Sequence, residues 1–306
     1  MKIVVDKPIL RLFFNVDIIG STNYKMALSN DDIHSWLPLF REFYQVFPNV
    51  LEQSINDKKK EHFYNNVKTE EIKIWKLLGD EIIFYSDLKD SKACGLFVSA
   101  LKEAINLYQK KYLPEELGLK ACAYIAGFPV NNVEIEINGV TDFIGSNIDV
   151  GFRLMKYASR EKMPISIELA YILTHYSFDL EYFFDGLEIL KGVLNNKPYP
   201  IFCIDMQNND DLKDIMPNVQ ANDVFKFCAE FIKKNDLLEF PFIENDEKRI
   251  FTEKPKDYEE KLLQVQKMYG IYKPKEIKTT SKLSDDELNK TLNLMNGIVI
   301  GNNNDG

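Results

Sequence analysis

The sequence contains few of the residues that build metal–thiolate sites or disulfide frameworks. Its 306 residues include four cysteines and three histidines. Cys94, Cys122, Cys203 and Cys228 form no C-x-x-C pair, so no zinc-binding spacing emerges. We therefore expect reduced, buried thiols, as in a cytoplasmic protein.

Long apolar runs and positive charge are also lacking. No run reaches the roughly 20 apolar residues that span a bilayer. Asp6 and Pro8 interrupt any signal-peptide core, so we expect neither a membrane segment nor a leader. The net charge of −9 argues against a nucleic-acid partner. A nucleoside triphosphate remains possible, because a bound metal and a few cations can set the field in a cleft.

What is present is an alternation of strand-like and helix-like segments. Apolar runs and periodicity predict strands and helices in the order β-α-β-β-α-β, which is typical of a ferredoxin-like α+β sheet. The segments that carry this pattern are a strand at 9–16, a hairpin at 71–78 and 82–85, a helix at 91–112 and a strand at 119–125. We predict this α+β domain over residues 1–206.

The last hundred residues have a different pattern. Prolines separate helix-like segments at 221–234, 258–269 and 285–295, and the chain ends in a polar stretch that we expect to be flexible. Residues 207–306 are therefore predicted to be a helical extension, in which no chemical motif is found.

Two aspartates lie where apolar runs end. Asp17 follows the first predicted strand, and Asp80 lies at the tip of the predicted hairpin. If these strands are neighbours, the two carboxylates converge on one edge, where they repel each other. A divalent cation relieves that repulsion, and Mg²⁺ is usually held by one or two carboxylates plus substrate phosphates. The alternative is that both aspartates are ordinary turn or capping residues.

The residues after Asp17 turn from strand into helix at a glycine. Ser21 or Thr22 can cap that helix, and backbone N–H groups there are free for a phosphate. We therefore take Ile18, Gly20, Ser21 and Thr22 as candidate substrate-binding residues.

These motifs, DIIGST at 17–22 and WKLLGDE at 75–81, resemble those of the class III nucleotide cyclases. Within that family the chain is most similar to the pyrimidine-nucleotide cyclases of bacterial Pycsar antiphage systems, over residues 9–205. The resemblance implies a class III cyclase domain that forms a 3′,5′-cyclic nucleotide and pyrophosphate. It also implies that Asp17 and Asp80 hold two Mg²⁺ or Mn²⁺ ions.

The segment TDFIGSNIDVGFR, residues 141–153, parallels a further motif of that family. On this resemblance Asp142 reads the base and Arg153 meets the triphosphate. Asp149 stands where the family usually has asparagine. Residues four apart share a helix face, so Asp149 and Arg153 either point into one cleft or form an ion pair. The alternative is that Asn147 takes the asparagine's role, although it lies on the other side of the helix.

Lysines complete the site that the resemblance implies. Lys76 aligns with a base-contacting lysine, and a lysine donor beside the Asp142 acceptor suits adenine, cytosine or uracil equally. Either Lys191 or Lys197 matches the phosphate-binding lysine. The aromatic neighbours of the base-reading pair, Trp75 and Phe143, either narrow the base pocket or belong to the core.

The family forms its sites between subunits. The resemblance therefore implies a homodimer in which one chain supplies the metal aspartates and the other the base-reading and arginine residues, with a cyclic-nucleotide-binding effector downstream. We expect UTP as substrate, then CTP. The alternatives are an adenylate cyclase, a catalytically silent nucleotide sensor, and a dinucleotide synthase with a Gly-Gly-Asp/Glu-Glu-Phe hairpin.

Overall fold

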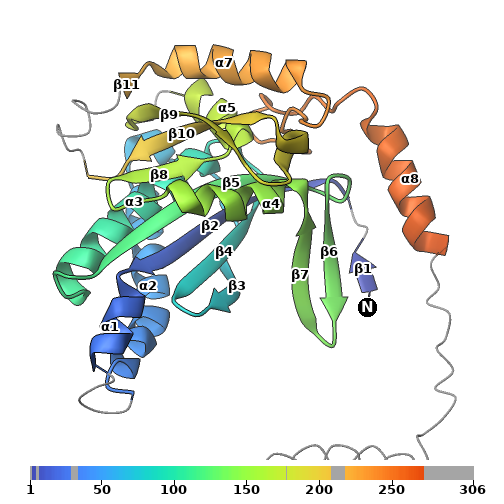
Figure 1. Cartoon of the computed structure of the whole chain (residues 1–306). Coiled ribbons are helices and arrows are strands. Elements are labelled where there is room, and N and C mark those ends of the chain that lie inside the picture. Colours follow the sequence, from blue (N-terminus) through green and yellow to red (C-terminus); the bar gives the residue numbers. More distant parts are fainter. Residues whose placement is uncertain (1, 5–6, 29–33, 177, 208–217, 272–306) are drawn as a thin grey trace, which may run out of the picture. The chain divides into compact units, whose positions relative to one another are not determined.

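The computed structural model describes residues 2–4, 7–28, 34–176, 178–207 and 218–271 (Figure 1). Residues up to Val265 form one compact unit, and a second begins at Gln266. The predicted helix at 285–295 and the polar tail lie outside the described residues, and the domain boundary at 206 stays a prediction. No described helix combines the length and apolar character needed to cross a membrane.

An eight-stranded sheet forms the centre of the first unit. Its core order is β5-β2-β4-β3, all antiparallel, with helices connecting β2 to β3 and β4 to β5. This is the ferredoxin-like arrangement, so the predicted α+β fold is confirmed. The four strands are β2 (Ile9–Ile19), β3 (Lys73–Leu78), β4 (Glu81–Leu88) and β5 (Gly118–Phe128).

Further strands extend the sheet beyond β5. The added strands are β8 (Lys162–Ile165), β10 (Pro198–Asp205), β9 (Tyr182–Ile189) and β11 (Asn218–Val219), in that order across the sheet. β8 runs parallel to β5 and antiparallel to β10, so the whole sheet is mixed.

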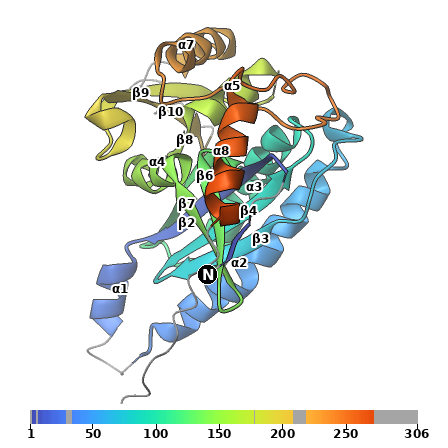
Figure 2. The same cartoon turned by 90° about the vertical axis from the view of Figure 1, so that its right-hand side faces the viewer.

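Helices cover both faces of the sheet, with α2 and α3 on one side and α4 on the other (Figure 2). The α-helices are α1 (Ser21–Leu28), α2 (Leu37–Lys58), α3 (Ala93–Tyr112), α4 (Ser146–Leu154), α5 (Ile167–His175), α7 (Ala221–Lys234) and α8 (Tyr258–Ile271). Short 3₁₀ turns are η1 (His62–Tyr64), η2 (Met155–Tyr157) and η3 (Val193–Asn196).

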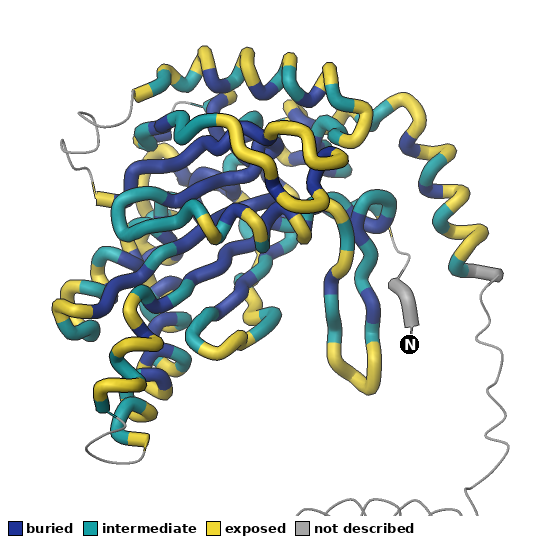
Figure 3. The backbone as a smooth tube through the Cα atoms, in the orientation of Figure 1, coloured by how far each residue is buried: buried dark blue, intermediate teal, exposed yellow. Residues whose placement is uncertain are grey.

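The two-sided cover explains why β2 is buried along most of its length (Figure 3). On the α4 face, the rings of Phe13 and Tyr124 stack with centroids 5.2 Å apart. On the α2 face, Phe84 packs against Phe47. A strand that is buried on both faces has a continuous apolar sequence. Such a sequence is what predicted β2.

The prediction that Asp17 ends the first strand is wrong. β2 continues to Ile19, because residues 17–19 keep their pairing with Lys120, Leu119 and Gly118 of β5. Asp17 therefore lies inside a paired strand, with neighbours on both sides that a strand-end residue would not have.

A separate three-stranded sheet consists of β1 (Lys2–Val4), β6 (Asn132–Ile137) and β7 (Val140–Gly145). The β6–β7 hairpin projects from the main sheet (Figure 1). Arg11 ties the hairpin to the main sheet, with Nη1 2.6 Å from Glu134 Oε2 and Nε 2.7 Å from Asp87 Oδ1. The sequence did not predict β7.

Candidate active site

The first cluster lies where β2 meets the β3–β4 hairpin. Gly79 and Asp80 form the two-residue turn, and Gly79 has a φ of +68°, which favours glycine. Asp17 pairs with Glu81, and the N–H of Ile18 donates to the carbonyl of Asp80 at 3.3 Å. The structure thus brings Asp17 and Asp80 to the same place, as predicted.

Burial is the main influence on the Asp17 carboxylate. It raises the pKa of Asp17, the Lys120 ammonium opposes the rise, and the charge of Asp80 adds to it. Lys120 Nζ lies 3.1 Å from Asp17 Oδ2. A pair of partly buried carboxylates with one cation suits a divalent ion held partly by substrate phosphates. The described residues contain no group of three or more acidic, histidine or cysteine side chains placed for a metal.

The start of α1 lies directly against this cluster. Gly20 turns the chain with a φ of +84°, and α1 begins at Ser21. The buried Ser21 hydroxyl donates to Asp80 Oδ2, so it orients the carboxylate instead of capping the helix. Ile18 is buried and Thr22 is exposed. Of the four candidate substrate-binding residues, Ser21 and Ile18 therefore contact Asp80 directly.

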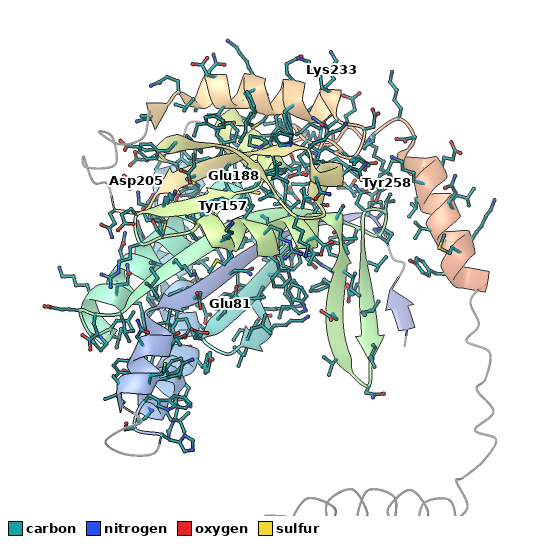
Figure 4. The ribbon with its side chains drawn as sticks, viewed as in Figure 1. Glu81, Tyr157, Glu188, Asp205, Lys233 and Tyr258 are labelled. Carbon is teal, nitrogen blue, oxygen red and sulfur yellow. The ribbon has the colours of Figure 1, made fainter. Side chains whose placement is uncertain are left out.

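Two neighbours of the cluster were missed from the sequence. The Tyr44 hydroxyl of α2 donates to the carbonyl of Gly79. Glu81 lies at the start of β4 beside β2 (Figure 4), where its Oε1 accepts from Asn15 Nδ2 at 2.7 Å. Burial and then the nearby aspartates raise the pKa of Glu81, and the Asn15 hydrogen bond opposes this. Successive side chains of a strand point to opposite faces. The sequence of β2 therefore already places Asn15 and Asp17 on one face.

The second cluster joins β3 to β7. Lys76 Nζ lies 2.6 Å from Asp142 Oδ1, and Trp75 Nε1 donates to the same oxygen at 3.1 Å. Consecutive strand residues normally face opposite ways. Here the register shifts between Ile74 and Lys76, and such a bulge lets two neighbours share a face. The predicted Lys76–Asp142 pair is thus formed within one chain, with Trp75 as an unforeseen third member.

The two aromatic candidates for the base pocket differ in their environment. Phe143 is 3% exposed and contacts the rings of Phe13, Tyr85 and Phe128, so it belongs to the core. Trp75 is half-buried, and the Lys76 ammonium lies 4.5 Å from its ring centroid. Of the two, only Trp75 is therefore partly exposed beside the base-reading pair.

On α4, Asp149 and Arg153 face the turn at 191–196. Arg153 Nε donates to the carbonyl of Lys191 at 3.3 Å, and Asp149 lines a cleft with the same turn. Between these two described residues there is no ion pair. Asn147 lines the same cleft, and its Nδ2 donates to Glu168 Oε1 at 3.1 Å. Asp149 and Asn147 thus both lie at this cleft, and the preference for Asp149 in the asparagine's role stays a prediction.

The lysines of the η3 turn differ in their relation to Arg153. Lys191 is exposed and its backbone binds Arg153, whereas Lys197 is exposed beyond the turn, at the start of β10. Leu194, Asn195 and Asn196 all have positive φ, between 48° and 60°. Three such residues in a row are a strained backbone, and strain of this kind gathers at functional sites.

No protein-family model and no curated protein sequence matches this chain. Solved structures similar to it include adenylyl and guanylyl cyclases. The adenylyl cyclase CyaB from P. aeruginosa has 14% identity and a TM-score of 0.46, covering 65% of this chain and 94% of that one. The adenylate/guanylate cyclase/hydrolase from Silicibacter pomeroyi has 13% identity and a TM-score of 0.42, with 65% and 98% covered.

A third similar structure is the guanylate cyclase domain of RhGC from Catenaria anguillulae in complex with GTP. Its identity is 13% and its TM-score 0.43, with 65% of this chain and 98% of that one covered. The assignment of a function therefore rests on this chain's own residues.

Proposed function

We propose that the chain is a metal-dependent nucleotide cyclase that converts a nucleoside triphosphate into a 3′,5′-cyclic nucleotide and pyrophosphate. One observation carries the proposal. A single hairpin places Asp80 at its tip, beside Asp17 and Ser21, and Lys76 four residues earlier, paired with Asp142. The hairpin therefore carries one carboxylate for divalent ions and the lysine of a donor–acceptor pair for a base.

Asp17 and Asp80 would hold two Mg²⁺ or Mn²⁺ ions. Such ions supply Lewis-acid charge that lowers the pKa of a ribose 3′-hydroxyl and stabilises a leaving pyrophosphate. Ser21 holds the Asp80 carboxylate in place for this task. Backbone N–H groups at the start of a helix suit the triphosphate, and the residues assigned to it are Ile18, Gly20, Ser21 and Thr22.

Negative charge develops on the phosphorus oxygens in the transition state. Its stabilisation by fixed cations is the largest electrostatic contribution to phosphoryl transfer. Arg153 and Lys191 take this role, and the hydrogen bond from Arg153 to the Lys191 backbone keeps the two together. Asp149, one helical turn before Arg153 on the same face, would position the ribose or the arginine.

A homodimer would bring Lys76, Asp142 and Arg153 of one chain to the aspartates of the other. Apolar side chains support an interface along the edge strand and the projecting hairpin. Those more than two-fifths exposed include Ile74, Leu77 and Leu78 of β3 and Val140 and Ile144 of β7. Exposed apolar side chains gathered on an edge strand usually mark a contact surface.

The proposal also includes the identity of the base. The Trp75 indole lies beside Lys76 and binds Asp142, so it takes up space next to the base-reading pair. A two-ring purine needs more room there than a one-ring pyrimidine. We therefore assign UTP as the preferred substrate and CTP as the second, with a cyclic-nucleotide effector and a role in antiphage defence.

An adenylate cyclase is the second candidate, because the Lys76–Asp142 pair also suits adenine N1 and its 6-amino group. Incubation with an equimolar mixture of the four labelled triphosphates and Mn²⁺ decides between them. Cyclic UMP should dominate and cyclic CMP follow. If cyclic AMP dominated, the chain would instead be assigned as an adenylate cyclase. Bound nucleotide without any product would indicate a catalytically silent sensor.

A further inference from the structure

A small cavity lies between β2, β5, the first turn of α4, and the segment that follows α7. Its volume of about 40 Å³ has room for about three water-sized groups. Apolar side chains line one part of it, among them Leu10, Ile125, Phe128, Phe240 and Phe242. Tyr258, at the start of α8, also lines it.

Glu168 of α5 and Glu239, which follows α7, contribute the charged groups of the wall. Glu168 is 3% exposed, and its Oε1 accepts from Asn147 Nδ2 at 3.1 Å. Its Oε2 has no hydrogen-bond partner among the described residues. Burial raises the pKa of Glu168 to about 7. A buried carboxylate oxygen without a donor is costly, so a donor that reached Oε2 would stabilise the ionised carboxylate.

An open cleft of about 400 Å³ adjoins the cavity. The two spaces share five lining residues: Asn131, Ser146, Asn147, Leu237 and Glu239. Apolar side chains of Val130, Val150 and Leu238 line part of the cleft. A space of this size accepts a small molecule.

The charges of the cleft are predominantly negative. Asp149 and Asp236 line it, are exposed, and form no ion pair with any residue in the described part of the chain. Lys261 also lines it, but its ammonium is already bound to Glu239 and to Asp257. A ligand that occupies both spaces therefore meets a buried carboxylate at one end and two free carboxylates at the other.

We propose that the cavity and the cleft together bind an aliphatic diamine or polyamine. One ammonium group would donate to Glu168 Oε2, the methylenes would lie along the apolar walls, and a second ammonium would lie near Asp236 and Asp149. An anionic ligand would be repelled, and a neutral apolar ligand would leave Oε2 without a donor. A metal ion finds no group of three suitable side chains in the part of the chain that the structure describes.

This proposal goes beyond the nucleotide cyclase and does not depend on it. Binding is measured with the full chain, without nucleotide and without divalent ions. Isothermal titration with putrescine, a four-carbon diamine, at about pH 8 keeps Glu168 ionised. We expect saturable binding of one diamine per chain. Butylamine should bind about tenfold more weakly, because it lacks the second ammonium, and the matching diol should not bind measurably.

Matched variants test the residues. Glu168→Gln keeps the size of the side chain and should weaken putrescine binding by about tenfold or more. Asp236→Asn should weaken it a few-fold. The control Glu230→Gln, an exposed change on α7, should leave it unchanged. Thermal melting verifies that each variant is folded.

A second route leaves Glu168 in place. Leu237→Trp puts a bulky ring at the shared rim of cavity and cleft and should block putrescine binding. Absence of saturable putrescine binding by the wild-type chain would overturn the proposal. Unchanged binding in both Glu168→Gln and Leu237→Trp would do so as well, because the amine would then bind elsewhere.

Discussion

The ammonium of Lys120 in β5 lies 3.1 Å from Oδ2 of Asp17 in β2, at directly paired positions. The Lys120 ammonium is thus paired with a carboxylate that we propose as a metal ligand. We expect Lys120→Gln to tighten Mn²⁺ binding about fivefold, because an ion pair of this kind stabilises by about 1 kcal/mol. Titration of Mn²⁺ followed by electron paramagnetic resonance measures this affinity. Weaker binding in the variant would mean that Lys120 supports the metal site.

The Lys76–Asp142 pair is predicted to read the base. Lys76→Met and Asp142→Asn should each lower kcat/KM about tenfold or more, since each leaves a partner without its ion pair. Mn²⁺ affinity should not change, because neither residue touches Asp17 or Asp80. The ratio of cyclic nucleotides from a triphosphate mixture is the measurement. An unchanged ratio in both variants would remove the pair from base recognition.

Subunit complementation tests the proposed dimer. Asp80→Ala and Arg153→Ala should each be inactive alone, because each lacks one part of every site. Mixing them should restore up to about one quarter of wild-type activity, since half of the random dimers are mixed and each regains one of two sites. Native mass spectrometry confirms that the subunits exchange. Exchange without rescue would indicate a site formed within one chain.

The buried Glu168 should make stability depend on pH. Its folded-state pKa, about 7, lies above the value of 4.5 for an exposed glutamate. The folded state therefore keeps a proton that the unfolded state has lost, and unfolding free energy should fall from about pH 5 to about pH 7. The nearby titratable groups, Tyr199 and Cys228, remain neutral in this range because their pKa values are raised.

The matched change is Glu168→Gln. It should remove this slope and stabilise the protein at about pH 8 by up to about 3 kcal/mol. Urea unfolding at several pH values measures the effect, with Glu230→Gln as the control. A variant that keeps the wild-type slope would show that another group titrates.

Much of the core of the fold was predictable from local patterns. β2 and the β3–β4 hairpin were visible because apolar runs bounded by turn residues are short-range signals. The same patterns brought Asp17 and Asp80 to neighbouring strands. The end of β2 was misjudged because an aspartate in mid-strand is uncommon, and only pairing with Lys120 explains it.

Contacts between distant segments were not predictable. The bulge that turns both Trp75 and Lys76 toward Asp142 depends on register with β4, which no single-strand pattern encodes. Burial of Glu168 depends on α4 and on the segment after α7, more than 60 residues further along. The bulge and the burial both come from packing between distant segments. From the sequence alone, a charged residue in α5 is therefore expected to be exposed.

The central claim is tested most directly by product stoichiometry with UTP and Mn²⁺. The account predicts that wild-type protein releases cyclic UMP and pyrophosphate in equal amounts, and that Asp80→Asn lowers both by about a thousandfold, as loss of a metal worth several kcal/mol implies. Asp223→Asn, an exposed change on α7, should match wild type. Pyrophosphate released with no cyclic nucleotide from any of the four triphosphates, or full turnover by Asp80→Asn, would contradict the account.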